Sequence, residues 1–276
     1  MTISLPLQQH SGLQRGYIYN PSIDGVDENL LILFHGLGDR PDPYGRLTKT
    51  MVLPQTASLA VAGPMEIPET GGGSAWITCY DEEWDEIQPS PAERRRIDSL
   101  AKTRGLLMEL LDKLHSQCGW PYRRMHLFGF SQGGTVALDL AKTCRGEKRL
   151  GSCVSISGAL MEEQLYGAAD KAAPKSGTPV LITHGDHDDT VTRAHMKECV
   201  VRLKEEGCDV EFETLSDKGH GMLSSEAEMR LIMAFWARCL SRRPQAAPGA
   251  DFVEVTGGAE RVLQSAAAQN AAGQSS

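Results

Sequence analysis

The pentapeptide Gly129-Phe130-Ser131-Gln132-Gly133 is the stretch of this chain whose residue types point most directly to chemistry. A serine held on a tight turn between small residues projects its hydroxyl away from the backbone, where the oxygen can attack an acyl carbon. Such a turn needs a strand before it and a helix after it, and the runs Met125–Phe128 and Thr135–Ala141 fit these two elements. The alternative interpretation is a glycine-rich turn that closes an ordinary strand–helix unit.

A serine hydroxyl becomes a good nucleophile only when a base takes its proton and a carboxylate orients that base. His220 is the best candidate base among eight histidines, because it lies between two glycines on a loop before the last predicted helix. The candidate acids, Asp186, Asp188 and Asp189, share the loop that follows the apolar run Val180–Thr183. At most one of them can point at His220, and the spacing does not decide which.

The loop after Thr183 also permits a second interpretation. His184, Asp186, His187 and Asp188 are all residue types that bind metal ions. They crowd into one loop, however, and no other pair of histidines or cysteines in the sequence complements them. We therefore expect neither a metal nor a cofactor.

Acyl transfer also needs backbone N–H groups that stabilise the oxyanion of the tetrahedral intermediate. The N–H of Gln132 is one candidate, since it directly follows the serine at the start of a predicted helix. The N–H of Leu37 is the second, because His35-Gly36-Leu37-Gly38-Asp39 follows the predicted strand Leu30–Phe34 and its two glycines let the backbone fold back. A plain glycine turn would give the same pattern.

The elements that must position these residues alternate between strand and helix. Continuous apolar runs predict buried strands, and apolar residues at helical spacing predict helices. Repeated units of this kind predict an α/β fold with a mainly parallel central sheet and helices on both faces. The predicted strands are Leu30–Phe34, Ser58–Ala62, Met125–Phe128, Cys153–Ile156, Val180–Thr183 and Val210–Leu215, and the predicted helices are 99–114, 135–141, 192–206 and 229–240.

Composition limits the partners. The 36 acidic residues outnumber the 28 basic ones, which gives a net charge of −8. A nucleic-acid partner is therefore not expected, because phosphate binding favours a basic surface. The short cluster Arg94-Arg95-Arg96 is flanked by Glu93 and Asp98, and we interpret it as the solvated start of a helix.

The sequence also indicates a compartment and a domain division. Seven cysteines without C-x-x-C pairs indicate reduced thiols. No secretory signal is visible, and no apolar run approaches the roughly 18 residues that cross a bilayer. These features predict a cytoplasmic protein without stable membrane insertion. Residues 1–243 are predicted to form the folded domain, and residues 244–276, rich in Ala, Gly, Ser and Gln, a flexible tail.

Together these motifs resemble the acyl-protein thioesterase / carboxylesterase (phospholipase/carboxylesterase) family of α/β-hydrolases. The similarity extends from about Leu30 to Leu240 and rests on the segments 33–39, 129–134, 184–188 and 219–220. It implies the α/β-hydrolase fold, with Ser131 as nucleophile, Asp188 as acid and His220 as base. It also implies oxyanion donors at Leu37 and Gln132, in agreement with the residue-based argument.

The chain departs from the family pattern on the substrate side. The family often carries Ser-Trp-Phe-Asp where this chain has Ala75-Trp76-Ile77-Thr78, so only the tryptophan is kept. Trp76 is therefore the candidate substrate-binding residue, and Trp84 a further one, with simple core packing as the alternative. Asp189 stands where a proline commonly follows the acid. Residues 67–97 replace the segment that shapes the acyl groove in better-known members.

We therefore expect a serine hydrolase that cleaves carboxylic esters or thioesters through an acyl-enzyme intermediate. By the resemblance, its substrates are small acyl esters or acylated proteins such as palmitoyl-proteins. The alternative is a non-catalytic module of the same fold that binds a small apolar ligand, since a fold does not guarantee activity. The acyl chain length and the oligomeric state do not follow from the sequence.

Overall fold

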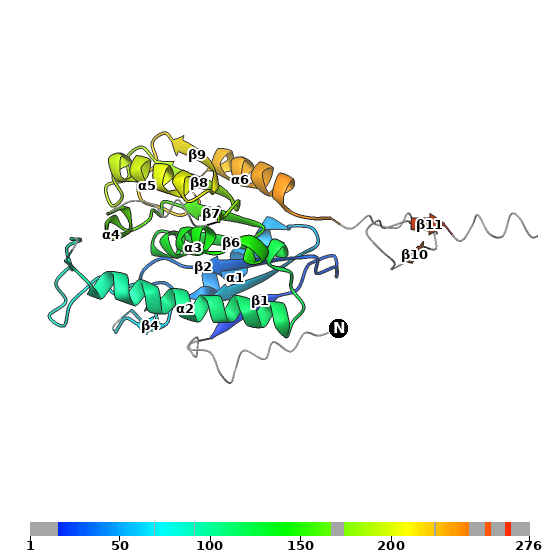
Figure 1. The fold of residues 1–276 in the computed structure, drawn as a ribbon, viewed down its shortest axis with the longest axis horizontal. Coiled ribbons are helices and arrows are strands. Elements are labelled where there is room, and N and C mark those ends of the chain that lie inside the picture. Colours follow the sequence, from blue (N-terminus) through cyan, green and yellow to red (C-terminus); the bar gives the residue numbers. More distant parts are fainter. Residues whose placement is uncertain are drawn as a thin grey trace, which may run out of the picture. The chain divides into compact units, whose positions relative to one another are not determined.

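A seven-stranded sheet forms the centre of the protein (Figure 1). The computed structural model describes residues 16–68, 70–90, 92–166, 174–223 and 225–242, and the backbone of 252–254 and 263–265. Only the edge strand β1 is antiparallel to its neighbour, and the other strands pair in parallel, which confirms the predicted mainly parallel sheet. The strands lie in the order β1 (Tyr17–Asn20), β3 (Thr56–Val61), β2 (Asn29–Phe34), β6 (Met125–Phe130), β7 (Ser152–Ile156), β8 (Pro179–Gly185) and β9 (Asp209–Leu215).

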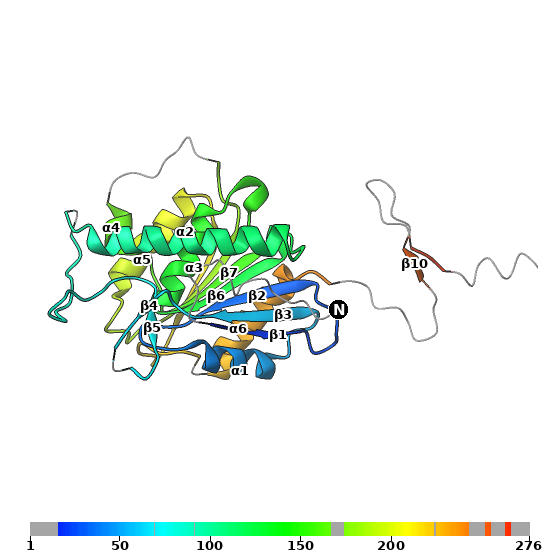
Figure 2. The ribbon, with the colours of Figure 1, turned by 90° about the horizontal axis from the view of Figure 1, so that it is seen from below.

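Helices cover both faces of this sheet, as Figure 2 shows. One face carries α1 (Pro41–Met51) and α6 (Glu226–Cys239). The other carries α2 (Arg95–Ser116), α3 (Gln132–Thr143), α5 (Arg193–Glu205) and the short α4 (Glu162–Leu165). The smaller elements are β4 (Met65–Glu66), which pairs with β5 (Ser74–Ala75), and the 3₁₀ turns Tyr122–Arg124 and Gly146–Lys148.

The two layers explain why the central strands are continuously apolar. All six residues of β2 are buried. Because side chains alternate across a strand, Leu30, Ile32 and Phe34 pack under α2 and α3, whereas Leu31 and Leu33 pack under α1 and α6. A strand with helices on both faces has no polar side, and this makes such strands visible in the sequence.

Sequence analysis missed β1 and α1, as well as the short α4, β4 and β5. Helix α1 begins with Pro41 at its first turn and also contains Pro43 and Gly45, residues that lower helix propensity. A Cβ atom at position 45 would lie 2.7 Å from Cγ2 of Ile18 in β1, so the glycine lets helix and strand approach closely. Tertiary packing therefore outweighs local propensity here.

Residues 242–276 form a separate unit. Its described part is a pair of short antiparallel strands, β10 (Phe252–Glu254) and β11 (Leu263–Ser265), which sequence analysis did not predict. Most of the predicted flexible tail lies outside the described residues, so that assignment stays a prediction. In the described part of the chain, no helix has the length and apolar character that a membrane span requires.

Candidate active site

Ser131, His220 and Asp188 meet in hydrogen-bond contact at the carboxyl ends of three parallel strands. Ser131 follows β6, Asp188 follows β8 and His220 follows β9. The His220 Nε2 atom lies 2.8 Å from the Ser131 Oγ atom. On the other side of the ring, Nδ1 lies 2.9 Å from Oδ2 of Asp188 and 3.1 Å from its Oδ1. Since a carboxylate only accepts, Nδ1 carries the proton and Nε2 is left to accept the serine proton.

The backbone at Ser131 has the conformation of a nucleophile elbow. Its φ of 51° and ψ of −121° lie outside the regions that ordinary residues prefer. The bond from its N–H to the carbonyl of Ile156 fixes the turn. A Cβ atom at Gly129 would collide with the carbonyl of Gly133, and one at Gly133 with the carbonyl of Phe34. The two glycines are therefore required by the close approach of backbone to backbone.

Only one of the three candidate acids points at His220. The Asp188 side chain is fully buried, and its Oδ1 also accepts the N–H groups of Thr190 and Val191 at 3.0 and 2.8 Å. Burial alone would raise the pKa of Asp188, but the bonds from Val191 and His220 outweigh it, so the pKa is lowered. Its stabilising contribution is thus present above the pKa of an unfolded aspartate and is lost as the pH falls through the lowered value. Asp186 and Asp189 are exposed.

His184 is a neighbour of this site that sequence analysis considered only as a metal ligand. Its Nδ1 atom lies 3.6 Å from Oδ2 of Asp188, and burial lowers its pKa, so the ring is neutral near pH 7. Neither ring nitrogen has a hydrogen-bond partner among the described residues. Within the same part of the chain, no group of three or more His, Cys, Asp or Glu residues is arranged to hold a metal ion. We interpret His184 as a neutral, buried side chain that packs against Asp188.

The loop that carries Leu37 is held in place by the buried His35. The Nδ1 atom of His35 lies 2.6 Å from the carbonyl of Gly36, so this nitrogen donates. The Nε2 atom then accepts the N–H of Gly63 at 3.0 Å. A bond from the N–H of Gly38 to the carbonyl of Ser74 ties the loop to β5. These bonds fix a backbone that passes beside Ser131.

Trp76 lies in the core and is not among the described residues that line the cavity beside Ser131. It is fully buried, with its ring edge-on to Phe34 at 5.3 Å, and its indole N–H donates to the carbonyl of His35 at 2.8 Å. This position argues against the predicted contact between Trp76 and the substrate. Through its bond to His35, the indole instead supports the loop that carries Leu37. Trp84 is half exposed and packs on Tyr80, which lines the cavity, but Trp84 itself is not among the described lining residues.

The side chain of Gln132 has a role that the sequence did not reveal. Its Oε1 atom accepts the N–H groups of Trp76 and Ile77 at 2.6 and 3.2 Å, and its Nε2 atom donates to the carbonyl of Ile77 at 2.9 Å. The residue after the nucleophile thus fixes the segment that forms one wall of the site.

A cavity of about 450 Å³ opens beside Ser131, and Leu37 and Gln132 also line it. Part of the unusual segment 67–97 borders the site, since the cavity wall includes Ile77, Cys79, Tyr80, Glu86, Gln88 and Pro89. That this segment shapes the acyl groove stays a prediction. Arg96 contributes to the wall as well, which corrects the interpretation of the arginine run as uniformly solvated. Arg94 and Arg95 are themselves exposed and pair with Asp98 and Glu93, but Arg96 turns inward to Glu163.

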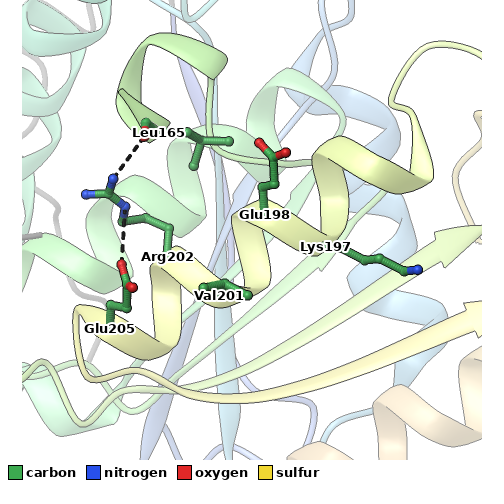
Figure 3. A pocket seen from close by; sticks show the side chains of 6 residues that line it. All are labelled: Leu165, Lys197, Glu198, Val201, Arg202 and Glu205. Atoms are coloured by element: carbon green, nitrogen blue, oxygen red, sulfur yellow. Dashed lines mark hydrogen bonds and ion pairs between the residues drawn. The ribbon is translucent and has the colours of Figure 1, made fainter. Parts of the chain in front are cut away.

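A second depression lies along α5, and its described lining residues include no serine, cysteine or histidine (Figure 3). There Arg202 donates to the carbonyl of Leu165 at 3.0 Å and lies 3.8 Å from the carboxylate of Glu205. Two of its polar side chains, Arg202 and Glu205, thus bind each other, and its described lining residues do not reproduce the Ser, His and Asp arrangement found at Ser131.

A buried ion pair anchors the loop of His220. The Nζ atom of Lys218 lies 2.5 Å from Oε1 of Glu228 on α6, and the two side chains are 5% and 0% exposed. Thr183 in β8 donates to the same oxygen at 2.7 Å. The carbonyl of Lys218 accepts the N–H of His187, so the base loop and the acid loop are tied together. Lysine and glutamate are common surface residues, so no sequence signal marked this pair.

Replacing Lys218 with methionine should lower the free energy of unfolding by about 3–5 kcal/mol, because it removes the cation beside a fully buried carboxylate. Urea unfolding followed by circular dichroism measures the change. Arg230→Met is the matched control: it breaks an exposed pair with Glu226 on the same helix and should cost about 0–1 kcal/mol. Equal losses in the two variants would contradict the assigned role of Lys218.

Comparison with known proteins places this architecture in a family. The profile of the phospholipase/carboxylesterase family matches residues 22–240. An uncharacterized hydrolase of Mycosarcoma maydis is 35% identical over 186 residues, which are 65% of this chain and 65% of that protein. This aligned part is slightly less than two thirds of the relative's length.

Two further proteins extend the comparison. Acyl-protein thioesterase 1 of Kluyveromyces lactis is 26% identical over 222 residues, 77% of this chain and 92% of that protein. The crystal structure of esterase PE8 has the same fold, with a TM-score of 0.67, 24% identity, and coverage of 81% of this chain and 98% of the other. The chain belongs to the phospholipase/carboxylesterase family of α/β-hydrolases.

Proposed function

We propose that this protein is a serine hydrolase that cleaves carboxylic esters or thioesters through an acyl-enzyme intermediate. The observation that carries the proposal is the contact chain from the Ser131 hydroxyl through His220 to the buried Asp188. The name of the Kluyveromyces relative supports a thioester of an acylated protein as one substrate class, and esterase relatives support small esters. The comparisons give the non-catalytic alternative no support.

In the proposed mechanism, the Oγ atom of Ser131 attacks the acyl carbon while Nε2 of His220 takes its proton. The oxyanion is stabilised by the backbone N–H groups of Leu37 and Gln132, beside the start of α3. His220 then protonates the leaving alcohol or thiol, and the acyl group stays on Ser131. Water repeats the attack with His220 as base, which releases the acid. Asp188 holds the ring and stabilises its charged form.

The cysteines support a cytoplasmic location as part of this proposal. All seven are free in the structure, and burial raises the pKa of Cys144 and Cys199 to about 12. A buried thiol with a raised pKa stays protonated and is therefore unreactive. Free cysteines are typical of a reducing compartment.

The proposal is tested by mixing enzyme with excess p-nitrophenyl butanoate in a stopped-flow instrument. Where deacylation is slower than acylation, we expect a burst of nitrophenolate equal to the enzyme concentration, followed by steady turnover. A fluorophosphonate probe should label the peptide that contains Ser131. A protein that gives neither turnover nor labelling would refute the proposed function.

A further inference from the structure

The cavity beside Ser131 lies on the side where the acyl group, and not the leaving group, must sit. The inference that the cavity holds the acyl group rests on the proposed function. Ser131 and the two proposed oxyanion residues, Leu37 and Gln132, line the cavity, whereas His220 is not among its described lining residues. The leaving group is protonated by Nε2 of His220 and must therefore depart on the histidine side. The acyl chain then extends from Ser131 into the cavity.

The wall of this cavity is apolar in part and charged in part. Ile77, Leu160 and Val191 supply an apolar surface, while Arg96, Glu86 and Glu162 supply charges. A hydrocarbon chain in contact with these charged groups would displace the water that solvates them. The carboxylates of Glu86 and Glu162 would also repel an acyl chain that carries a carboxylate at its far end.

Arg96 lines the cavity and forms an ion pair with Glu163, which is not among the described lining residues. The Nε atom of Arg96 lies 2.9 Å from Oε1 of Glu163, and the two side chains are 15% and 4% exposed. The guanidinium also donates to the carbonyl of Ile87 at 3.1 Å. The carboxylate oxygens of Glu163 have no hydrogen-bond partner among the described residues. The carboxylate is thus already out of contact with water, and solvent reaches the pair only at the 15% of the Arg96 side chain that is exposed. An apolar chain that covers this part of Arg96 would remove that water.

We propose that the Arg96–Glu163 pair limits the acyl subsite, so that the enzyme prefers short acyl groups over long hydrocarbon chains. A butanoyl group finds the apolar surface near Ser131. A longer chain must extend over the Arg96 side of the ion pair and remove the water that still reaches this guanidinium. The pair is thus a specificity determinant that acts through desolvation of charge.

The test is the ratio of kcat/KM for p-nitrophenyl octanoate to that for p-nitrophenyl butanoate. For the wild-type protein we expect a ratio of about 0.1 or less. The double variant Arg96→Met, Glu163→Met replaces both charges with apolar side chains of similar length, a change that buried pairs usually tolerate. In this variant the ratio should rise about tenfold, while the unfolding temperature verifies that the protein is folded.

The exposed pair of Arg94 and Asp98 on the same helix gives the matched control. The variant Arg94→Met, Asp98→Asn should keep the wild-type ratio. A wild-type ratio near 1, or an unchanged ratio in the folded Arg96→Met, Glu163→Met variant, would overturn the inference and leave the proposed function standing. Absence of hydrolysis of both esters and of fluorophosphonate labelling would overturn the proposed function and this inference with it.

Discussion

Replacing Ser131 with alanine should lower kcat for p-nitrophenyl butanoate by about 10⁶-fold, as removal of the nucleophile does in a well-studied serine protease. The hydroxyl oxygen is the atom that becomes acylated, so its loss leaves only background hydrolysis in the pocket. Steady-state rates at high enzyme concentration measure the residual activity. The same variant should lose fluorophosphonate labelling, which mass spectrometry detects on the intact protein.

Two controls make this result specific. Thermal unfolding of Ser131→Ala shows whether the fold persists; alanine at a position with φ of 51° keeps the same backbone strain as serine. Ser116→Ala removes a hydroxyl at the end of α2 that donates to the carbonyl of Asp112, far along the helix from the site, and should leave both rate and labelling unchanged. If Ser131→Ala were still labelled, the nucleophile would have to be sought elsewhere.

The catalytic candidates were predictable because each follows a strand that the sequence makes visible. Parallel strands buried on both faces are continuous apolar runs, and their carboxyl ends meet at one edge of the sheet. The glycines around Ser131 and His220 added a second signal. The choice of Asp188 over Asp186 and Asp189 did not follow from spacing, because all three share one short loop. It came from the family resemblance, and the structure now places Asp188 alone against His220.

The surroundings of the site were not predictable in this way. Arg96 belongs to a run of three arginines, and only the turn of α2 decides that its side chain faces Glu163 while its two predecessors face solvent. Trp76 matched a family position, yet its indole faces the core. The Lys218–Glu228 pair joins a loop to a helix by residue types that usually stay in water. Each of these contacts depends on tertiary packing, which has no local pattern.

Replacing Asp188 with asparagine should lower kcat by about 10⁴-fold, the loss seen for the equivalent change in a serine protease. The amide keeps the shape of the side chain but offers a donor where the carboxylate accepts the N–H of His220 at Nδ1. The ring is then held in the wrong tautomer, and its charged form loses the neighbouring negative charge. Because the pKa of Asp188 is lowered, the wild-type carboxylate is ionised throughout the neutral range, so this difference should persist from pH 6 to pH 9.

Asp186→Asn and Asp189→Asn are matched controls in the same loop. Both side chains are exposed, and Asp186 lies 3.7 Å from the exposed His187. Each change should lower kcat less than about threefold, since surface substitutions of this kind leave the buried contacts intact. Fluorophosphonate labelling should slow in Asp188→Asn but still occur at Ser131, because the nucleophile is present and only its activation is impaired. Equal losses in all three variants would mean that the loop acts through its overall charge, and Asp188 would then not be the orienting acid.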